Sequence, residues 1–222
     1  MENQSISTGT PNIFLKKHSV VIRIWHWITF LFITASIITV LLASTLLNPR
    51  ANIGMVKEQL QSKGLTVTND QAFAVSHRYE DKAWDVHKWI GFGIAFLLLS
   101  RLAIELVQPG EEKFRSRLKN AIRLYKQNDE MKLTYRHYIS VKLSYILFYA
   151  LLLCMVLTGL GLAFGEDLGF SRGLHGTIKQ IHSFGQYCMY AFVLVHIGGV
   201  IIADNKEAKG IVSGMVNGGM TD

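Results

Sequence analysis

The sequence contains few of the residues that mark several common classes of protein. Charged residues make up 18% of its 222 positions, whereas a soluble domain averages about 25%. Two cysteines are too few for a disulfide framework, and no C-x-x-C-H run is present for covalent haem attachment. Three prolines argue against a fibrous or disordered chain. These shortages exclude a disulfide scaffold and a c-type cytochrome, and they argue against a soluble domain.

Long apolar runs take the place of the missing charge. Half of the residues (50%) are hydrophobic, and the mean hydropathy is +0.25. A helix needs about 20 mostly apolar residues to cross the hydrocarbon core of a bilayer, and an open sheet cannot cross lipid with its backbone groups unsatisfied. Four segments meet the length requirement, at about 20–47, 87–107, 141–164 and 180–203.

These runs predict an all-α membrane protein built as a four-transmembrane-helix bundle. The membrane domain is expected to cover residues 20–204, between an N-terminal segment at 1–19 and a flexible C-terminal tail at 205–222. The first apolar run is about twice as long as the apolar region of a signal peptide. It is therefore expected to remain in the protein as the first helix.

Positive charge is unevenly distributed between the two sides of the predicted bundle. The net charge is +7, and the side with both termini and the 108–140 loop carries twice the Lys and Arg of loops 46–86 and 164–178. The positive-inside rule then places both termini in the cytoplasm of a bacterial inner membrane. In a chain this apolar, the excess indicates membrane topology rather than nucleic-acid binding.

The 108–140 loop is itself a candidate for contact with lipid. Its basic residues are typical of an amphipathic segment that lies against anionic lipid. A solvated loop whose positive charge only sets the orientation of the chain in the membrane would have the same composition. These residues are Lys113, Arg115, Arg117, Lys119, Arg123 and Lys126.

Four of the eight histidines lie in or at the edge of the apolar spans: His26, His87, His182 and His196. Ionisable residues at membrane depth are costly, which makes them functional candidates. His182 and His196 are 14 residues apart on the fourth helix. They therefore face the same side of that helix, with a rise of about 21 Å between them.

The four histidines match in depth as two pairs. His26 and His196 lie near the cytoplasmic edge, whereas His87 and His182 lie at the opposite edge. Antiparallel packing would therefore offer the pairs His26–His196 and His87–His182. Two imidazoles that meet across a bundle can hold the iron of a b-type haem without covalent attachment. The spacing predicts two such haem sites between the helices.

Glycines accompany these histidines. Gly185 and Gly199 each follow a histidine of the fourth helix by three residues, and Gly91 and Gly93 follow His87. A missing side chain at these positions leaves room for a flat macrocycle. We therefore expect these glycines to line the two sites.

Arg23 stands one turn before His26. Its guanidinium can pair with a haem propionate. Alternatively, Arg23 serves only to orient the helix in the membrane, and its charged end reaches the membrane interface.

Two other interpretations of the histidines remain open. A histidine inside a membrane can be a core residue hydrogen-bonded to a backbone carbonyl. A zinc or proton-relay site would need histidines that converge at one depth, often beside carboxylates, whereas these four are spread across the membrane. Among the other histidines, His175 is the main rival ligand, because it lies seven residues before His182 on the same side.

The residues around these histidines also resemble one known family. The similar stretches are Arg23-Ile24-Trp25-His26-Trp27, Trp84-Asp85-Val86-His87-Lys88-Trp89-Ile90-Gly91, Thr158-Gly159-Leu160, and His182 with His196. Over roughly residues 15–205 the chain resembles the four-helix di-haem cytochromes b. That family includes bacterial cytochrome b561 and the membrane subunits of respiratory NiFe hydrogenases and formate dehydrogenases. The length of loop 46–86 departs from the family's pattern.

The resemblance implies two haem b groups, a cytoplasmic-side one on His26 and His196 and a periplasmic-side one on His87 and His182. It also implies that electrons pass from the iron–sulfur or catalytic subunit of a periplasmic oxidoreductase to a quinone. The quinone site would lie near His196, His26 and the N-terminal segment.

No nucleotide-binding glycine motif, Fe–S cysteine set or hydrolytic constellation is present, so the chain is expected to conduct electrons. Two alternatives remain open. The chain could be a stand-alone cytochrome b561-like quinone reductase. It could also be a haem-free membrane anchor subunit that uses its histidines for packing.

Overall fold

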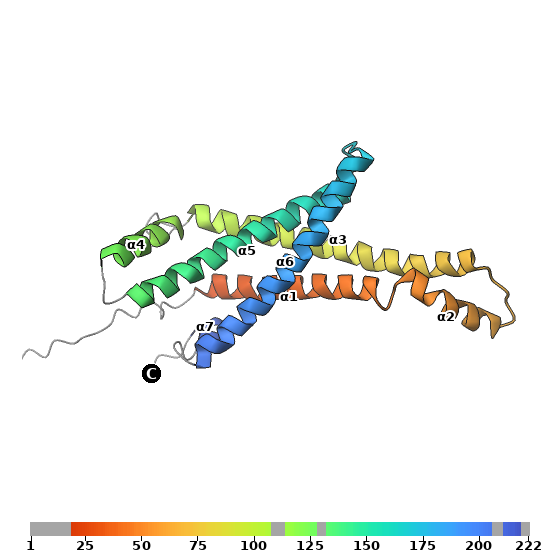
Figure 1. Cartoon of the computed structure of the whole chain (residues 1–222), viewed down its shortest axis with the longest axis horizontal. Helices are drawn as coiled ribbons and strands as arrows, with labels where there is room; N and C mark the ends of the chain where they lie inside the picture. Colours follow the sequence, from red (N-terminus) through yellow and green to blue (C-terminus); the bar gives the residue numbers. More distant parts are fainter. Residues whose placement is uncertain (1–18, 108–113, 128–131, 206–210, 219–222) are drawn as a thin grey trace, which may run out of the picture. The chain divides into compact units, whose positions relative to one another are not determined.

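The computed structural model describes residues 19–107, 114–127, 132–205 and 211–218, and every regular element in these ranges is a helix (Figure 1). Within the described part of the chain, four helices are long and apolar enough to cross a membrane: α1, α3, α5 and α6. The predicted all-α membrane fold is thereby confirmed. In chain order the helices are α1 (Val20–Ser44), α2 (Pro49–Gln61), α3 (Asn69–Val107), α4 (Phe114–Gln127), α5 (Lys132–Phe164), α6 (Arg172–Asn205) and α7 (Ile211–Val216).

Helix α3 begins 18 residues before the apolar run that marks its membrane span. A capping box explains this start. The backbone N–H of Gln71 donates to Thr68 Oγ1 at 3.2 Å, and the Gln71 side-chain oxygen accepts from the N–H of Thr68 at 2.9 Å. The boundary expected at residue 87 was therefore set too late, because hydropathy detects the membrane span and not the polar turns that precede it.

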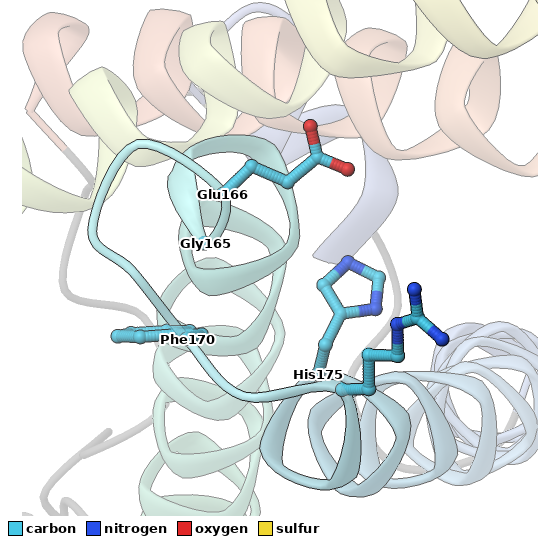
Figure 2. A pocket seen from close by; sticks show the side chains of 5 residues that line it. Gly165, Glu166, Phe170 and His175 are labelled. Carbon is cyan, nitrogen blue, oxygen red and sulfur yellow. The ribbon is translucent and has the colours of Figure 1, made fainter.

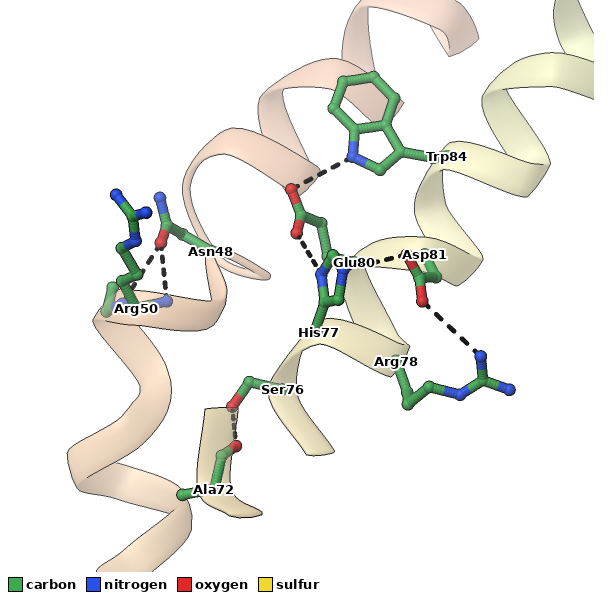
Figure 3. Close-up of polar contacts among 10 residues, drawn as sticks. Asn48, Arg50, Ala72, Ser76, His77, Arg78, Glu80, Asp81 and Trp84 are labelled. Carbon is green, nitrogen blue, oxygen red and sulfur yellow. Dashed lines mark hydrogen bonds and ion pairs between the residues drawn. The ribbon is translucent and has the colours of Figure 1, made fainter. Parts of the chain in front are cut away.

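The connection expected as loop 46–86 is mostly helical. Asn48 caps α2, since its Oδ1 accepts from the N–H groups of Arg50 at 3.1 Å and Ala51 at 3.3 Å, as drawn in Figure 3. The chain leaves α2 through a Schellman motif in which Gly64 takes a left-handed φ of 77°. Lys57 Nζ then donates to Asn69 Oδ1 at 2.8 Å. Helix α2 thus packs beside the start of α3.

Helices α5 and α6 also extend beyond their apolar runs. They begin at Lys132 and Arg172 rather than near residues 141 and 180. Gly169, with φ 70°, lies in the turn between them. Ser171 caps α6, because its Oγ accepts from the N–H of Leu174 at 3.2 Å.

The two ends of the chain and the 108–140 loop are described only in part. Residues 1–18 of the N-terminal segment lie outside the described residues, as do 108–113 and 128–131 of the loop. Helix α4 occupies the middle of that loop. Within the expected flexible tail, Ile211–Val216 form the short helix α7.

The chain divides into two compact units. Unit 1 comprises Met1–Trp25, Pro109–Phe148 and Met189–Asp222, and unit 2 comprises His26–Gln108 and Tyr149–Cys188. Unit 2 holds most of the buried apolar side chains, namely Ala43, Ala72, Ile94, Ala95, Leu97, Leu98 and Leu152.

Close helix contacts within unit 2 depend on glycine and aromatic side chains. A Cβ on Gly93 of α3 would overlap the ring of Phe32 of α1. The rings of Phe92 on α3 and Phe164 on α5 stack with their centres 5.6 Å apart. These contacts bring α1 and α5 against α3.

Many large apolar side chains of the spanning helices are exposed. Trp89, Phe96 and Leu99 of α3 are 74%, 70% and 65% exposed. Apolar surface on this scale is typical of a helix face that contacts lipid.

The capping box predicts a measurable effect at the start of α3. Thr68→Ala removes the acceptor of the Gln71 N–H, and losing such a cap costs about 1 kcal/mol. The amides of the first turn of α3 should then exchange hydrogen about fivefold faster, as measured by hydrogen–deuterium exchange in detergent.

Thr68→Ser should keep the original exchange rate, and Thr66→Ala should serve as the control outside the cap. Unchanged protection in Thr68→Ala would show that the helix does not depend on this cap.

Candidate functional site

His87 of α3 and His182 of α6 lie together in unit 2. Their ring centres are 6.4 Å apart, and the two ring planes are nearly perpendicular, at 89°. Both residues are half-buried and belong to helices that can span a membrane. The structure therefore brings together one of the two histidine pairs predicted from the spacing.

This separation suits two imidazoles that share one metal ion. A metal–nitrogen bond of about 2 Å on each side puts the ring centres of two opposed imidazoles about 6 Å apart. Imidazole is also a standard axial ligand of haem iron. The donor chemistry and the separation of His87 and His182 thus fit a bis-imidazole site.

A threonine hydroxyl lies against one nitrogen of each ring. Thr39 Oγ1 of α1 lies 3.0 Å from His87 Nδ1, and Thr158 Oγ1 of α5 lies 2.9 Å from His182 Nδ1. The Nδ1 edge of each ring is therefore occupied by the protein. Nε2 is left as the nitrogen for a metal ion.

Neighbouring residues shape the space around the two rings. A Cβ on Gly159 would lie 3.3 Å from His182 Cε1, tighter than ordinary contact. The ring of Trp84 meets that of His87 edge to face, with the centres 5.7 Å apart. Gly159 therefore leaves room for the ring of His182, and Trp84 limits the movement of His87.

Sequence reasoning did not assign a role to Thr39 or Thr158. Thr158 belongs to the Thr158-Gly159-Leu160 stretch that resembles the cytochrome b family, whereas Thr39 belongs to none of the similar stretches. The available signal was a polar residue in an otherwise apolar span. Thr39 is only 9% exposed, and a buried hydroxyl needs a hydrogen-bond partner.

His26 and His196 belong to different units, and their pairing remains a prediction. In unit 2, the ring of His26 meets Trp27 edge to face at 5.5 Å between centres. In unit 1, the ring of His196 is nearly parallel to that of Phe192, with centres 6.2 Å apart and an angle of 6°. Each of these two histidines thus lies against an aromatic ring of its own helix.

Two further polar groups lie close in sequence to His26. The hydroxyl of Thr29 is buried, as is Nε of Arg23, and neither atom has a hydrogen-bond partner among the described residues. The Arg23 Nη1 group donates to the carbonyl of Val216 at 3.2 Å. Arg23 therefore contacts the end of α7, and its buried Nε–H is available for an anionic group.

The glycines singled out in the sequence have different surroundings. Apart from its chain neighbours and the backbone of its own helix, nothing among the described residues lies within 4 Å of a Cβ built on Gly91 or Gly199, and their place beside a ligand remains a prediction. A Cβ on Gly185, however, would lie 2.7 Å from Met155 Sδ. Gly185 thus packs against the Met155 side chain of α5, and Gly93 packs against the ring of Phe32; a place for either glycine beside a ligand remains a prediction.

His175, the rival ligand, lies about 10 Å along α6 from His182, since seven residues separate them. Its side chain lines a pocket at the turn between α5 and α6 (Figure 2). The other lining residues are Gly165, Glu166, Phe170 and Arg172. His175 is therefore separate from the pair of His87 and His182.

His77 lies outside the apolar part of α3 and is engaged by carboxylates (Figure 3). Its Nδ1 is 3.0 Å from Glu80 Oε2, and its Nε2 is 3.7 Å from Asp81 Oδ1. Trp84 Nε1 donates to the other oxygen of Glu80 at 3.2 Å. Both nitrogens of His77 face carboxylates, so this histidine belongs to a surface ion-pair cluster.

A conventional metal cluster is absent from the part of the chain that the structure describes, where no group of three or more His, Cys, Asp or Glu could hold an ion. His18 lies outside the described residues.

A family model described as prokaryotic cytochrome b561 matches residues 17–218, nearly the whole chain. No curated protein and no solved structure matches the sequence.

Proposed function

The chain belongs to the prokaryotic cytochrome b561 family, and from this premise we propose that it is a di-haem cytochrome linking a periplasmic oxidoreductase to the quinone pool. Members of the family are membrane b-type cytochromes that take part in electron transfer. The proposal adds the number of haems, their ligands and the two redox partners. The observation that carries it is the separation of 6.4 Å between the rings of His87 and His182.

The first haem would be held by His87 and His182. Haem b, when bound, supplies the one-electron redox chemistry of its iron. The two histidines would supply the ligand nitrogens, and the threonine hydroxyls at their Nδ1 atoms would keep the rings oriented. The apolar side chains of the surrounding helices exclude water, which strengthens these polar contacts.

The second haem would be held by His26 and His196. Support comes from their matched depth in the sequence and from the open space around Gly199, three residues after His196. The buried, unsatisfied Nε–H of Arg23 supports pairing with a propionate there.

The two redox partners follow from the orientation of the chain. With both termini in the cytoplasm, His87 and His182 lie on the periplasmic side, where an external oxidoreductase would deliver electrons. His26 and His196 then lie on the cytoplasmic side, and the quinone would bind near them. Transfer from one side to the other makes the chain an electron path across the inner membrane.

Substitution of the predicted cytoplasmic-side pair tests this assignment. His26→Ala and His196→Ala should each remove the same haem from purified protein, because one iron loses an axial ligand in both cases. The double variant should lose no more than either single one, as expected for residues that act as a unit. Haem content and reduced spectra measure the loss.

His175→Ala is the matched control, since it removes an imidazole from α6 outside both pairs, and it should keep both haems. If His26→Ala and His196→Ala removed different haems, the proposed pairing would be wrong. If both variants kept both haems, these histidines would be packing residues.

The orientation can be tested separately with topology reporters. A fluorescent protein that matures only in the cytoplasm should fluoresce when fused after Asp222. A phosphatase that is active only in the periplasm should be active when inserted at Gly64, between α2 and α3. The reverse pattern would exchange the donor and acceptor sides.

A further inference from the structure

The two histidines of the site share one feature, a hydrogen bond with a threonine from a neighbouring helix. Thr39 of α1 contacts His87 of α3, and Thr158 of α5 contacts His182 of α6. Both contacts involve Oγ1 and Nδ1, and their lengths differ by only 0.1 Å, at 3.0 and 2.9 Å. Four helices thus contribute to two equivalent hydrogen bonds.

The donor in each bond follows from the number of hydroxyl protons. A threonine hydroxyl has one proton and two lone pairs. Thr39 donates its proton to the carbonyl of Ser36 at 2.7 Å. Its oxygen can therefore only accept from His87, which makes Nδ1–H the donor.

The same count applies to the second pair. Thr158 lies 2.6 Å from the carbonyl of Cys154 and 3.2 Å from that of Met155. Either carbonyl takes the single hydroxyl proton, because a carbonyl oxygen can only accept. The oxygen of Thr158 is then an acceptor for the Nδ1–H of His182.

A neutral imidazole carries one proton, so protonation of Nδ1 leaves Nε2 with a free lone pair. The oxygens of Thr39 and Thr158 are the acceptors that hold this proton on Nδ1. Without these acceptors either nitrogen could carry the proton. The hydrogen bonds therefore prepare both rings for binding a metal ion through Nε2.

We infer that Thr39 and Thr158 are positioning residues that hold His87 and His182 in the Nδ1–H form and thereby set the strength of both axial ligands of the periplasmic-side haem. The inference rests on the proposed function, because it requires these histidines to ligate iron. A hydrogen bond from Nδ1–H to an acceptor makes the imidazole a more basic ligand. A more basic ligand stabilises the ferric state, so the two threonines lower the midpoint potential of this haem.

Removal of each hydroxyl at nearly constant side-chain volume tests the inference. Thr39→Val and Thr158→Val should each raise the midpoint potential of the periplasmic-side haem. A shift of the ferric–ferrous equilibrium by up to about tenfold is expected, which equals about 59 mV for a one-electron couple. Redox titration of purified protein should show the other haem unchanged. Thr39→Ser and Thr158→Ser keep the hydroxyl and should restore the original potential.

Two matched controls remove hydroxyls that donate to a carbonyl four residues earlier in the chain and not to a histidine. Thr45 donates to the carbonyl of Leu41 at 2.6 Å, and Thr177 donates to that of Gly173 at 3.1 Å. Thr45→Val and Thr177→Val should leave both potentials unchanged. If the Val variants at 39 and 158 shifted neither potential, or if the Ser variants shifted it equally, the inference would be wrong.

Loss of the haem is also informative. If a Val variant loses the periplasmic-side haem while the matching Ser variant keeps it, the hydroxyl is needed and the inference stands. Equal loss from both variants would overturn it.

The ligand assignment is tested in parallel with His87→Ala and His182→Ala. If both variants keep two haems, the proposed site itself is wrong. If both lose the periplasmic-side haem but the Val variants keep its potential, only the role of the threonines is overturned.

Discussion

The arrangement of the described site depends on one constraint, which is that a polar nitrogen inside a membrane must have a partner. An unsatisfied polar group in hydrocarbon costs several kcal/mol, and an imidazole has two nitrogens to satisfy. In unit 2, Thr39 and Thr158 satisfy one nitrogen of His87 and His182. The remaining nitrogen of each ring needs another partner, and a metal ion held between the rings would serve both. The cost of burial thus favours a cofactor at this place.

The packing of the helices brings the two threonines close to the rings of His87 and His182. Gly93 lets α3 approach Phe32 of α1, the helix that carries Thr39, and Gly185 lets α6 approach Met155 of α5, the helix that carries Thr158. Close approach at these glycines allows a short threonine side chain to reach an imidazole on the neighbouring helix. Gly93 and Gly185 therefore allow neighbouring helices to pack closely around the site.

Much of the fold was predictable from the sequence, because a spanning helix needs a long apolar run and a histidine within it is conspicuous. The early start of α3 was missed, since the capping box of Thr68 and Gln71 lies in polar sequence outside the span. The pairing of Thr39 with His87 was also missed, because it joins residues 48 apart and depends on how two helices pack. Helix spacing shows which residues share a face, but not which residue of another helix faces them.

The most direct test of the account is the ratio of haem b to protein in the purified, detergent-solubilised chain. It can be measured from the pyridine haemochrome spectrum together with quantitative amino-acid analysis. Four histidines in two pairs predict two haems per chain, with a b-type spectrum on reduction. One haem per chain would leave one pair without its proposed role. A folded protein without haem would contradict the account as a whole.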